Sequence, residues 1–344
     1  MEYRVLGASG MQVSTICLGA MMFGAMGNRD HDDAVRVIGT ALDAGVNFVD
    51  TADVYSLGES EQIVGKALRG RRDDVVLATK FGMPMGGEDR NRRGASARWI
   101  HRSVEDSLRR LQTDWIDLYL LHRPDHDTDL DETLSALSDL VRAGKIRAIG
   151  SSTFPAELMV EAQWAAERGG HRRFVAEQPL YSMLTRGNEN AVLPTAQRHG
   201  MGVLTYSPLN AGWLSGRAGN PLDSHRATSR PTMYDATIPE NKAKAEAVAA
   251  LSVVARDAGL SLPHLALGFV LAHSAITSVI IGPRTLDQLT SLLPAADIQL
   301  SRDILDRIDD IVPPGVDVNP ADNYAATPPA IADSRLRRRA YGWN

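Results

Sequence analysis

Eight short apolar segments alternate with longer amphipathic segments along this 344-residue chain, and the alternation predicts a (β/α)8 TIM barrel. Strand–helix units repeated in this way give a parallel sheet, and eight of them suggest closure into a barrel. A barrel of this length is commonly a single domain. A doubly wound open sheet is the alternative fold. However, no GxGxxG motif follows an early strand, as the classical dinucleotide-binding version of that fold requires.

The N-terminal segment departs from the repeat. Residues Tyr3–Val13 contain Gly7 and Gly10, which suits a small β-hairpin that closes the bottom of the barrel. The alternating elements begin after it. The expected strands are Thr15–Leu18, Asn47–Val49, Val75–Thr79, Ile116–Leu121, Ile146–Ile149, Phe174–Glu177, Gly202–Thr205 and Ser278–Ile281. The expected helices include Asp32–Ala44, Glu59–Leu68, Ala97–Leu111, Leu130–Ala143 and Pro155–Arg168.

Two helix starts carry clear capping residues. Ser96 precedes the helix Ala97–Leu111, and Thr285 precedes a helix expected at Leu286–Leu293. The segment Ser207–Glu240 is long and rich in Gly, Pro and Ser. Because a structureless loop of this length is uncommon unless it has a function, we expect it to cover a cofactor.

The C-terminal end also departs from the repeat. We expect residues 1–312 to form one barrel domain and residues 313–344 to form a tail. The tail is rich in Pro and Ala and then basic at Arg335–Arg339. It either docks on the barrel, covers the pocket or stays partly disordered. The basic cluster is expected to be solvated or to contact another subunit, which leaves a homo-oligomer open.

Composition excludes several classes of function. The net charge of −5 gives no basic field that would favour nucleic acid, and the single cysteine, Cys17, allows no internal disulfide. Cys17 lies in an apolar run and is expected to be a small core residue. Residues Met1–Val5 lack a signal-peptide core, and no stretch approaches the ~18 apolar residues of a membrane span. A soluble, cytoplasmic protein without a membrane partner is therefore expected.

Four polar residues fall where functional groups gather in a parallel barrel. Asp50, Lys80 and His122 end the second, third and fourth expected strands, and Tyr55 follows on the loop after Asp50. Each preceding strand is apolar, so these groups would lie at the end of the barrel in surroundings that exclude water. Buried polar groups of this kind need one another as hydrogen-bond or ion-pair partners. Alone, each residue is more often a cap, a solvated charge or a satisfied core group. Their joint placement predicts a catalytic set.

The set is suited to moving a proton during carbonyl reduction. A ketone or aldehyde that accepts hydride also needs a proton on its developing alkoxide. Tyr55 would supply it, because a nearby Lys80 ammonium favours the phenolate and so lowers the pKa of the phenol. Asp50 would keep Lys80 charged and oriented, and His122 would donate a hydrogen bond to the substrate oxygen. In the reverse direction the tyrosinate is the base for alcohol oxidation.

Polar and aromatic groups also follow the later strands. Ser152 and Thr153 end the fifth strand and Gln178 ends the sixth, so hydroxyl and amide groups can match a primary amide such as that of nicotinamide. Tyr206 ends the seventh strand, where its ring can stack on the nicotinamide. The following segment, Ser207–Arg217, offers backbone N–H groups and one cation for a pyrophosphate.

The eighth strand is followed by an anion-binding pattern. Gly282, Arg284 and Thr285 lie at the start of a helix, where the helix N-terminus and an arginine suit a 2′-phosphate. We therefore expect NADP(H), moderately preferred over NAD(H). Gln288 lies about one turn further along, within reach of the adenine end of the cofactor.

Several motifs resemble the aldo-keto reductase superfamily. They are Leu18–Gly24 (LGAMMFG), Gly45–Tyr55 (GVNFVDTADVY), Ser60-Glu61, Thr79-Lys80 and Asp117–Asp125 (DLYLLHRPD), and the resemblance extends from about Tyr3 to Ile311. It implies a (β/α)8 barrel, NADPH without a metal, and the tetrad Asp50, Tyr55, Lys80 and His122. The cofactor contacts that it implies are Gly19, Ala20, Asp50, Ser152, Thr153, Gln178, Tyr206, Ser207, Leu209, Gly212, Arg217, Gly282, Arg284 and Gln288, with Arg226 as a weaker candidate.

Three positions depart from the family pattern. Thr153 stands where many members have Asn beside the serine of the fifth strand, so one amide contact is lost or replaced. Ser291 and Leu292 stand where Glu and Asn commonly hold the adenine and ribose. Weaker cofactor binding, or adenine held by packing alone, is expected from these changes.

The loops near the tetrad are apolar and include the methionines Met22, Met26, Met83 and Met85, whose side chains adapt to irregular shapes. They favour a broad pocket for ketones or aldehydes with carbon rings or chains. Arg123 and His126 are candidate pocket charges whose position the sequence does not determine. The residues expected to line the substrate pocket are Met22, Phe23, Val54, Tyr55, His122 and Trp213.

Two other classes of protein compete with the enzyme hypothesis. Potassium-channel β subunits share the barrel and bind NADPH as regulatory or sensor modules, and the Ser207–Gly216 segment resembles theirs equally well. Such modules can lack the strand-four histidine, so His122 favours turnover. A metal-dependent barrel hydrolase would need clusters of His and Asp ligands at strand ends, and only one His lies at such a place.

Overall fold

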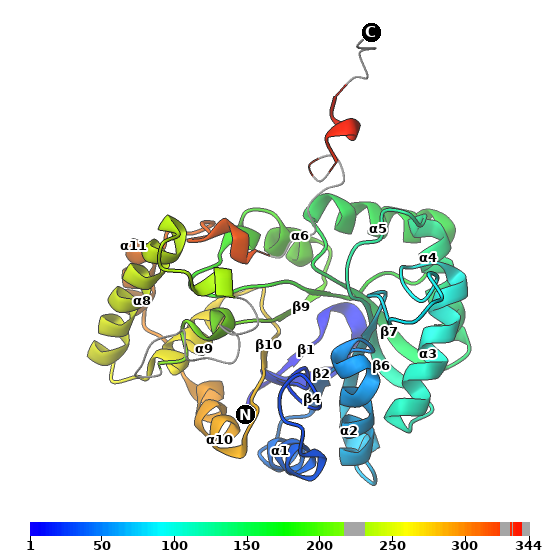
Figure 1. The fold of residues 1–344 in the computed structure, drawn as a ribbon, viewed down its shortest axis with the longest axis horizontal. Coiled ribbons are helices and arrows are strands. Elements are labelled where there is room, and N and C mark those ends of the chain that lie inside the picture. Colours follow the sequence, from blue (N-terminus) through cyan, green and yellow to red (C-terminus); the bar gives the residue numbers. More distant parts are fainter. Residues whose placement is uncertain (217–230, 324–330, 332, 339–344) are drawn as a thin grey trace.

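The computed structural model describes residues 1–216, 231–323, 331 and 333–338. Eight parallel strands close into a barrel in the order β10-β3-β4-β5-β6-β7-β8-β9, and the helices surround it (Figure 1). The (β/α)8 fold expected from the alternation is therefore confirmed. The barrel strands are β3 (Ile16–Gly19), β4 (Phe48–Asp50), β5 (Val76–Phe81), β6 (Ile116–Leu121), β7 (Ile146–Ser152), β8 (Ala176–Gln178), β9 (Gly202–Thr205) and β10 (Ser278–Ile281).

The helices follow the expected order, and the ends of the predicted ones shift by at most one residue. Ser96 caps α3 by accepting a hydrogen bond from the Trp99 N–H, and Thr285 caps α10 by accepting one from the Gln288 N–H, as predicted. The helices are α1 (His31–Asp43), α2 (Glu59–Ala67), α3 (Ala97–Leu111), α4 (Leu130–Arg142), α5 (Ala156–Gly169), α6 (Val192–Arg198), α8 (Pro239–Asp257), α9 (Leu262–Ala272), α10 (Leu286–Leu292) and α11 (Arg302–Ile311).

The N-terminal hairpin closes one end of the barrel. Strands β1 (Tyr3–Val5) and β2 (Gln12–Ser14) pair antiparallel, as predicted. Leu6 and Val13 are fully buried and join the side chains that fill the barrel interior, including Cys17 and Phe48. The hairpin is therefore a plug at the N-terminal ends of the strands, and the opposite end stays available for a site.

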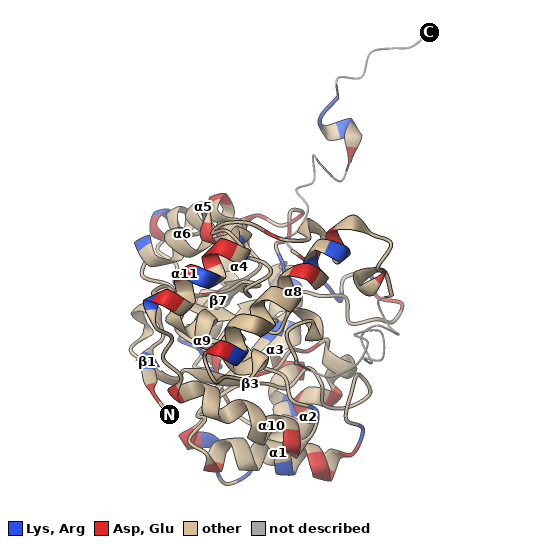
Figure 2. Ribbon diagram, turned by 90° about the vertical axis from the view of Figure 1, so that its left-hand side faces the viewer, with Lys and Arg blue, Asp and Glu red and all other residues tan. Residues whose placement is uncertain are grey.

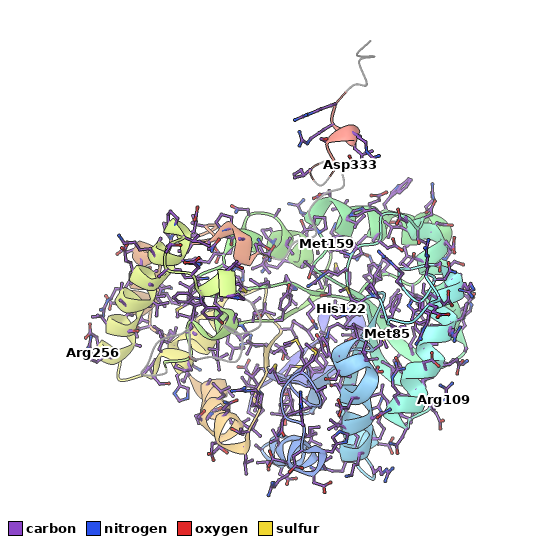
Figure 3. The ribbon with its side chains drawn as sticks, in the orientation of Figure 1. Met85, Arg109, His122, Met159, Arg256 and Asp333 are labelled. Carbon is purple, nitrogen blue, oxygen red and sulfur yellow. The ribbon has the colours of Figure 1, made fainter. Side chains whose placement is uncertain are left out.

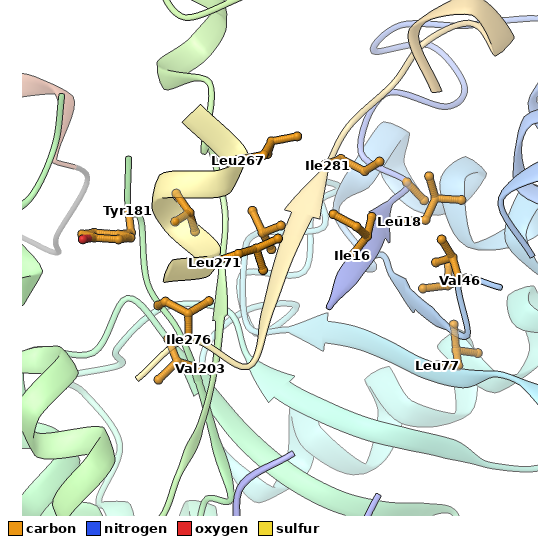
Figure 4. Close-up of a cluster of buried hydrophobic side chains, with 14 of the residues drawn as sticks. Ile16, Leu18, Val46, Leu77, Tyr181, Val203, Leu267, Leu271, Ile276 and Ile281 are labelled. Atoms are coloured by element: carbon orange, nitrogen blue, oxygen red, sulfur yellow. The ribbon is translucent and has the colours of Figure 1, made fainter. Parts of the chain in front are cut away.

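A second apolar layer lies between the strands and the helices. Ile16 and Leu18 of β3, Ile281 of β10, and Leu267 and Leu271 of α9 belong to it, and the close-up shows α9 lying against β10 (Figure 4). Both faces of every strand are thus covered by side chains, which explains why the strands appear in the sequence as apolar runs.

Charged side chains are spread over the outer helices, and neither sign dominates the face seen in Figure 2. Within the described residues, no individual helix has both the length and the apolar composition that a membrane crossing needs. Helices α8 and α9 reach that threshold only when taken together across a 91° bend.

Candidate active site

The four predicted catalytic residues meet at the C-terminal end of the barrel. Asp50 is the last residue of β4, Lys80 lies near the end of β5, and His122 follows the last residue of β6. Neighbouring strands are in register here, with Asp50 opposite Ala78 and Lys80 opposite Leu120. Strand pairing alone thus brings groups from three distant segments to one rim, and Figure 3 shows His122 near the middle of the molecule.

Lys80 is the centre of this group. Its side chain is fully buried, and Nζ donates to Asp50 Oδ2 at 2.6 Å, to the main-chain oxygen of Thr51 at 2.8 Å and to the Tyr55 hydroxyl at 3.3 Å. Gln178 Nε2 donates to the second Asp50 oxygen at 2.9 Å. Burial by itself lowers the pKa of Lys80, but Asp50 and Tyr55 outweigh it and leave that pKa raised. Lys80 is therefore an ammonium fixed between a carboxylate and a phenol.

The pKa of Tyr55 differs in direction from the sequence-based expectation. Burial raises it, and although Lys80 acts to lower it, the net pKa lies above the ordinary value. Lys80 thus limits the rise but does not reverse it. The phenol is accordingly protonated at neutral pH, which is the state needed by a proton donor.

His122 faces Tyr55, with the two ring centroids 5.7 Å apart and the planes at 83°. Burial, together with the charges of Lys80 and Arg123, lowers the pKa of His122 well below its usual value. The imidazole is therefore neutral and carries one N–H, which suits a hydrogen-bond donor to an oxygen held between His122 and Tyr55.

The loop that carries Tyr55 is strained. Ser56 and Leu57 adopt left-handed backbone conformations with φ of 49° and 53°, which are uncommon for residues other than glycine. Ser56 Oγ donates to the main-chain oxygen of Phe23 at 3.2 Å and accepts from the Met26 N–H at 3.1 Å. These bonds tie the Tyr55 loop to the loop after β3, a link that the sequence analysis did not identify.

The predicted nicotinamide groups lie on adjacent strand ends. Gln178 is buried at the end of β8, and its side-chain amide is already oriented by Asp50. Ser152, at the end of β7, donates to the main-chain oxygen of Gln178 at 3.0 Å. Thr153 follows with a left-handed φ of 59°, and its Oγ1 lies 3.4 Å from the hydroxyl of the half-buried Tyr206. These groups fit a flat, amide-bearing ring.

The segment after β9 fits a phosphate-bearing ligand. Ser207 and Asn210 have left-handed φ values of 57° and 45°. The N–H groups of Ser207 and Leu209 have no acceptor within the described part of the chain, and Gly212, whose φ is 105°, lies in the same turn. Free N–H groups on such a backbone suit an anion. The predicted contacts Arg217 and Arg226 lie outside the described residues.

The segment before α10 is held by its own contacts. Gly282 is exposed, and Gln288 Oε1 accepts from the Arg284 N–H at 2.8 Å, so Gln288 braces the helix start. The Arg284 side chain has no ion-pair partner among the described residues. Ser291 hydrogen-bonds to the Gln288 main chain, while Leu292 is buried in the core.

Gly19 and Ala20 are held by packing. A Cβ at Gly19 would lie 2.6 Å from Ile280 Cγ2, so glycine allows β3 and β10 to approach. Ala20 is fully buried, and its main chain bonds to Asp50 and Ser60.

The expected pocket residues are not all at a surface. Val54 and Tyr55 are partly exposed and Met22 is nearly buried, whereas Phe23 is fully buried in the core. Trp213 is also buried, with its ring stacked on Tyr234 at 5.6 Å and the Lys244 ammonium 4.6 Å away on its ring. In this structure the Phe23 side chain therefore has no surface that a substrate could contact, and the Trp213 side chain has little.

The two pocket charges that the sequence could not place are now located. His126 is exposed, whereas Arg123 is half-buried beside Thr153 and Tyr206. The only sequence signal for Arg123 is its position next to His122. Among the described residues, no three His, Cys, Asp or Glu side chains gather as a metal site requires.

Comparison with known proteins agrees with this geometry. Residues 15–313 match the model of the aldo/keto reductase family. The chain is 40% identical to an uncharacterized oxidoreductase, YrpG, of Bacillus subtilis over 91% of its length and 96% of the relative's. It is 33% identical to a probable voltage-gated potassium channel subunit beta of Arabidopsis thaliana (91% and 97% covered) and to norsolorinic acid reductase B of Aspergillus parasiticus (90% and 83%). The chain therefore belongs to the aldo/keto reductase family.

Proposed function

We propose that this protein is an NADP(H)-dependent oxidoreductase that interconverts a carbonyl and an alcohol, with Tyr55 as its general acid and base. The observation that carries this proposal is the contact of Lys80 with both Asp50 and Tyr55, beside a neutral His122. Relatives named as oxidoreductases and as norsolorinic acid reductase support the reaction class.

The residues divide the work of reduction between them. The reduced nicotinamide, when bound, supplies the hydride to the carbonyl carbon. His122 donates a hydrogen bond to the carbonyl oxygen, and Tyr55 transfers its proton to that oxygen as negative charge develops there. Lys80 stabilises the resulting tyrosinate by its charge, and Asp50 keeps Lys80 in place. In the oxidative direction the tyrosinate takes the alcohol proton back.

The preference for NADP(H) over NAD(H) rests on Arg284. Its guanidinium has no ion-pair partner among the described residues and stands next to the capped start of α10, which suits an added phosphate. Gln178, Ser152 and Thr153 would hold the nicotinamide amide, and Tyr206 would stack on its ring. The substrate is expected to be a carbonyl compound with a large apolar part, because Val54, which precedes Tyr55, is partly exposed and the loop that carries Met22 is bonded to the Tyr55 loop through Ser56.

The test is oxidation of NADPH, and separately of NADH, with a panel of aldehydes and ketones. We expect Tyr55→Phe to bind NADPH with unchanged affinity but to lose ~10²- to 10⁴-fold in kcat, because only the proton transfer is removed. Tyr3→Phe is the matched control, since Tyr3 lies on the hairpin and bonds to Gly45. Equal turnover by Tyr55→Phe and the wild type would exclude Tyr55 as the acid.

A second candidate function is that of a cofactor-binding regulatory or sensor module. The similarity to proteins named as potassium channel β subunits favours it. It predicts that the wild type binds NADPH tightly and yet turns over no carbonyl or alcohol in either direction. That outcome of the same assay would replace the enzyme proposal.

A further inference from the structure

We propose that Arg123 binds a carboxylate that the substrate carries close to its reacting carbonyl group. This inference rests on the function proposed above and narrows its substrate class. Arg123 follows directly after His122, is half-buried, and lies beside Thr153 and Tyr206 at the ends of β7 and β9. The sequence predicts an apolar substrate pocket, and the structure adds one positively charged side chain beside it.

The guanidinium is held by one of its ends. Nη1 donates to Thr153 Oγ1 and to the main-chain oxygen of His122, the latter at 3.3 Å. The central carbon lies 5.9 Å from the centroid of the Tyr206 ring, within reach of a cation–π interaction. The two hydrogen bonds and the Tyr206 ring orient the guanidinium before a ligand binds. Less conformational entropy is then lost on binding.

The opposite edge of the guanidinium is free. Nε and Nη2 have no hydrogen-bond acceptor, and Arg123 has no carboxylate within 4.0 Å, among the described residues. These two nitrogens are the pair that grips both oxygens of a carboxylate in parallel. The buried Glu177 carboxyl does not fill this role, because its oxygens accept from Ser151 Oγ and from the Phe154 N–H.

Arg123 lies next to the tetrad, because it directly follows His122 in the chain and bonds to the His122 main-chain oxygen. The charge of Arg123 acts on both His122 and Tyr55: it contributes to the lowered pKa of His122 and partly opposes the burial that raises the pKa of Tyr55. Because Arg123 is the chain neighbour of His122, a proposed contact of the carbonyl oxygen, we expect the carboxylate and the carbonyl group to belong to one small molecule. Lys80 cannot compete for the anion, because Asp50 already neutralises it.

The experiment compares acids with their own esters. The probes are 2-carboxybenzaldehyde, 4-carboxybenzaldehyde and the methyl ester of each, with NADPH as reductant. We expect the wild type to reduce at least one acid with a kcat/KM about tenfold or more above that of its ester, since hydrogen bonds to charged groups are strong. In Arg123→Met this acid-to-ester ratio falls to about one, and Arg123→Lys keeps part of it.

The matched control is Arg109→Met. Arg109 lies on the outer side of α3, far from His122 (Figure 3), and pairs with Asp106, so its loss should leave the acid-to-ester ratio unchanged. Reduction of the esters by the wild type shows that the proposed function stands, whatever Arg123 does. If neither acids nor esters are reduced, the proposed function itself fails.

Two results would overturn the assignment of Arg123. The first is equal reduction of acids and esters by the wild type. The second is an equal loss on acids and esters in Arg123→Met together with weaker NADPH binding, measured by fluorescence titration. That second result would assign the guanidinium to the cofactor, in place of the amide contact that Thr153 alters.

Discussion

At the scale of single residues, the site depends on how buried charges are compensated. Lys80 and Asp50 are both buried, and each supplies the partner that burial requires. A second buried carboxyl, Glu177, lies on β8 next to Gln178. Neutral donors, among them the Ser151 hydroxyl and the Phe154 N–H, bond to it, and burial outweighs them and the charge of Arg123 and raises its pKa to about 7. Glu177 is therefore a proton-binding group behind the turn that carries Ser152 and Thr153.

Glu177 makes stability depend on pH. The folded-state pKa of about 7 lies above the ordinary value of 4.5, so the native state binds one more proton than the unfolded chain between these values. The contribution of Glu177 is fully present below pH 4.5 and is lost as the pH rises through 7. In the wild type we expect Glu177 to lower the free energy of unfolding by about 3 kcal/mol between pH 4.5 and pH 8. Glu177→Gln should lack this pH-dependent loss, and urea denaturation at the two pH values measures it.

The control for this prediction is Glu161→Gln, at an exposed position of α5. It should follow the wild type at both pH values. An identical decline in wild type and Glu177→Gln would show that other groups cause the pH dependence.

At the scale of elements, the hairpin plug depends on close backbone contact. Gly7 has a φ of +51°, and a Cβ there would lie 2.4 Å from both the Gly202 nitrogen and the Val175 oxygen. Neither backbone atom can move without disturbing β8 or β9. Gly10, three residues away in the same hairpin, has a φ of +76° with no atom within 4 Å of an added Cβ. A comparison of substitutions at the two glycines therefore distinguishes the cost of a steric clash, expected only at Gly7, from the cost of a positive φ, expected at both.

We expect Gly7→Ala to lower the free energy of unfolding by about 3 kcal/mol or more, because it combines backbone strain with overpacking. Gly10→Ala should cost only about 1 kcal/mol, from its positive φ alone. Thermal and urea denaturation measure both. Equal losses in the two variants would mean that the plug adjusts its position freely.

At the scale of the whole molecule, the chain beyond the barrel returns to it. The segment from Pro313 to Asn323 is hydrogen-bonded to α8, whereas most of the tail after it lies outside the described residues. Lys244 of α8 donates to Asp322 at 2.6 Å, both side chains being buried, and Asn319 donates to Asn241 at 2.8 Å. Because Lys244 also lies on the Trp213 ring, this contact links the segment to the loop after β9.

We expect Lys244→Met and Asp322→Leu each to lower the free energy of unfolding by about 3–5 kcal/mol, because each leaves a buried charge without its partner. The double variant should recover much of this loss, since no unpaired charge remains. Urea denaturation of all four proteins gives the coupling energy of the pair. Purely additive losses would show that the two residues act independently.

Local patterns in the sequence are sufficient to predict the order and the type of the elements. Strands β6, β9 and β10 and helix α3 begin and end where their apolar patterns predicted, because those patterns are set by neighbouring residues. The positions of Asp50, Lys80 and His122 at strand ends followed from the same patterns. Strand β7, in contrast, continues three residues past the predicted end at Ile149, because Gly150–Ser152 pair with β8. These residues are small and polar, so the apolar pattern does not predict that they extend the strand.

Which side chains meet depends on the tertiary structure. It buried Phe23 and Trp213, which the sequence placed in the pocket, and it tethered Arg123, which the sequence left without a position. It also reversed the expected direction of the Tyr55 pKa, because burial outweighs the charge of Lys80. Local patterns record which face of an element is apolar. Burial, register and contacts between distant segments depend on how all the elements close together, and these long-range distances are what set the chemistry of the site.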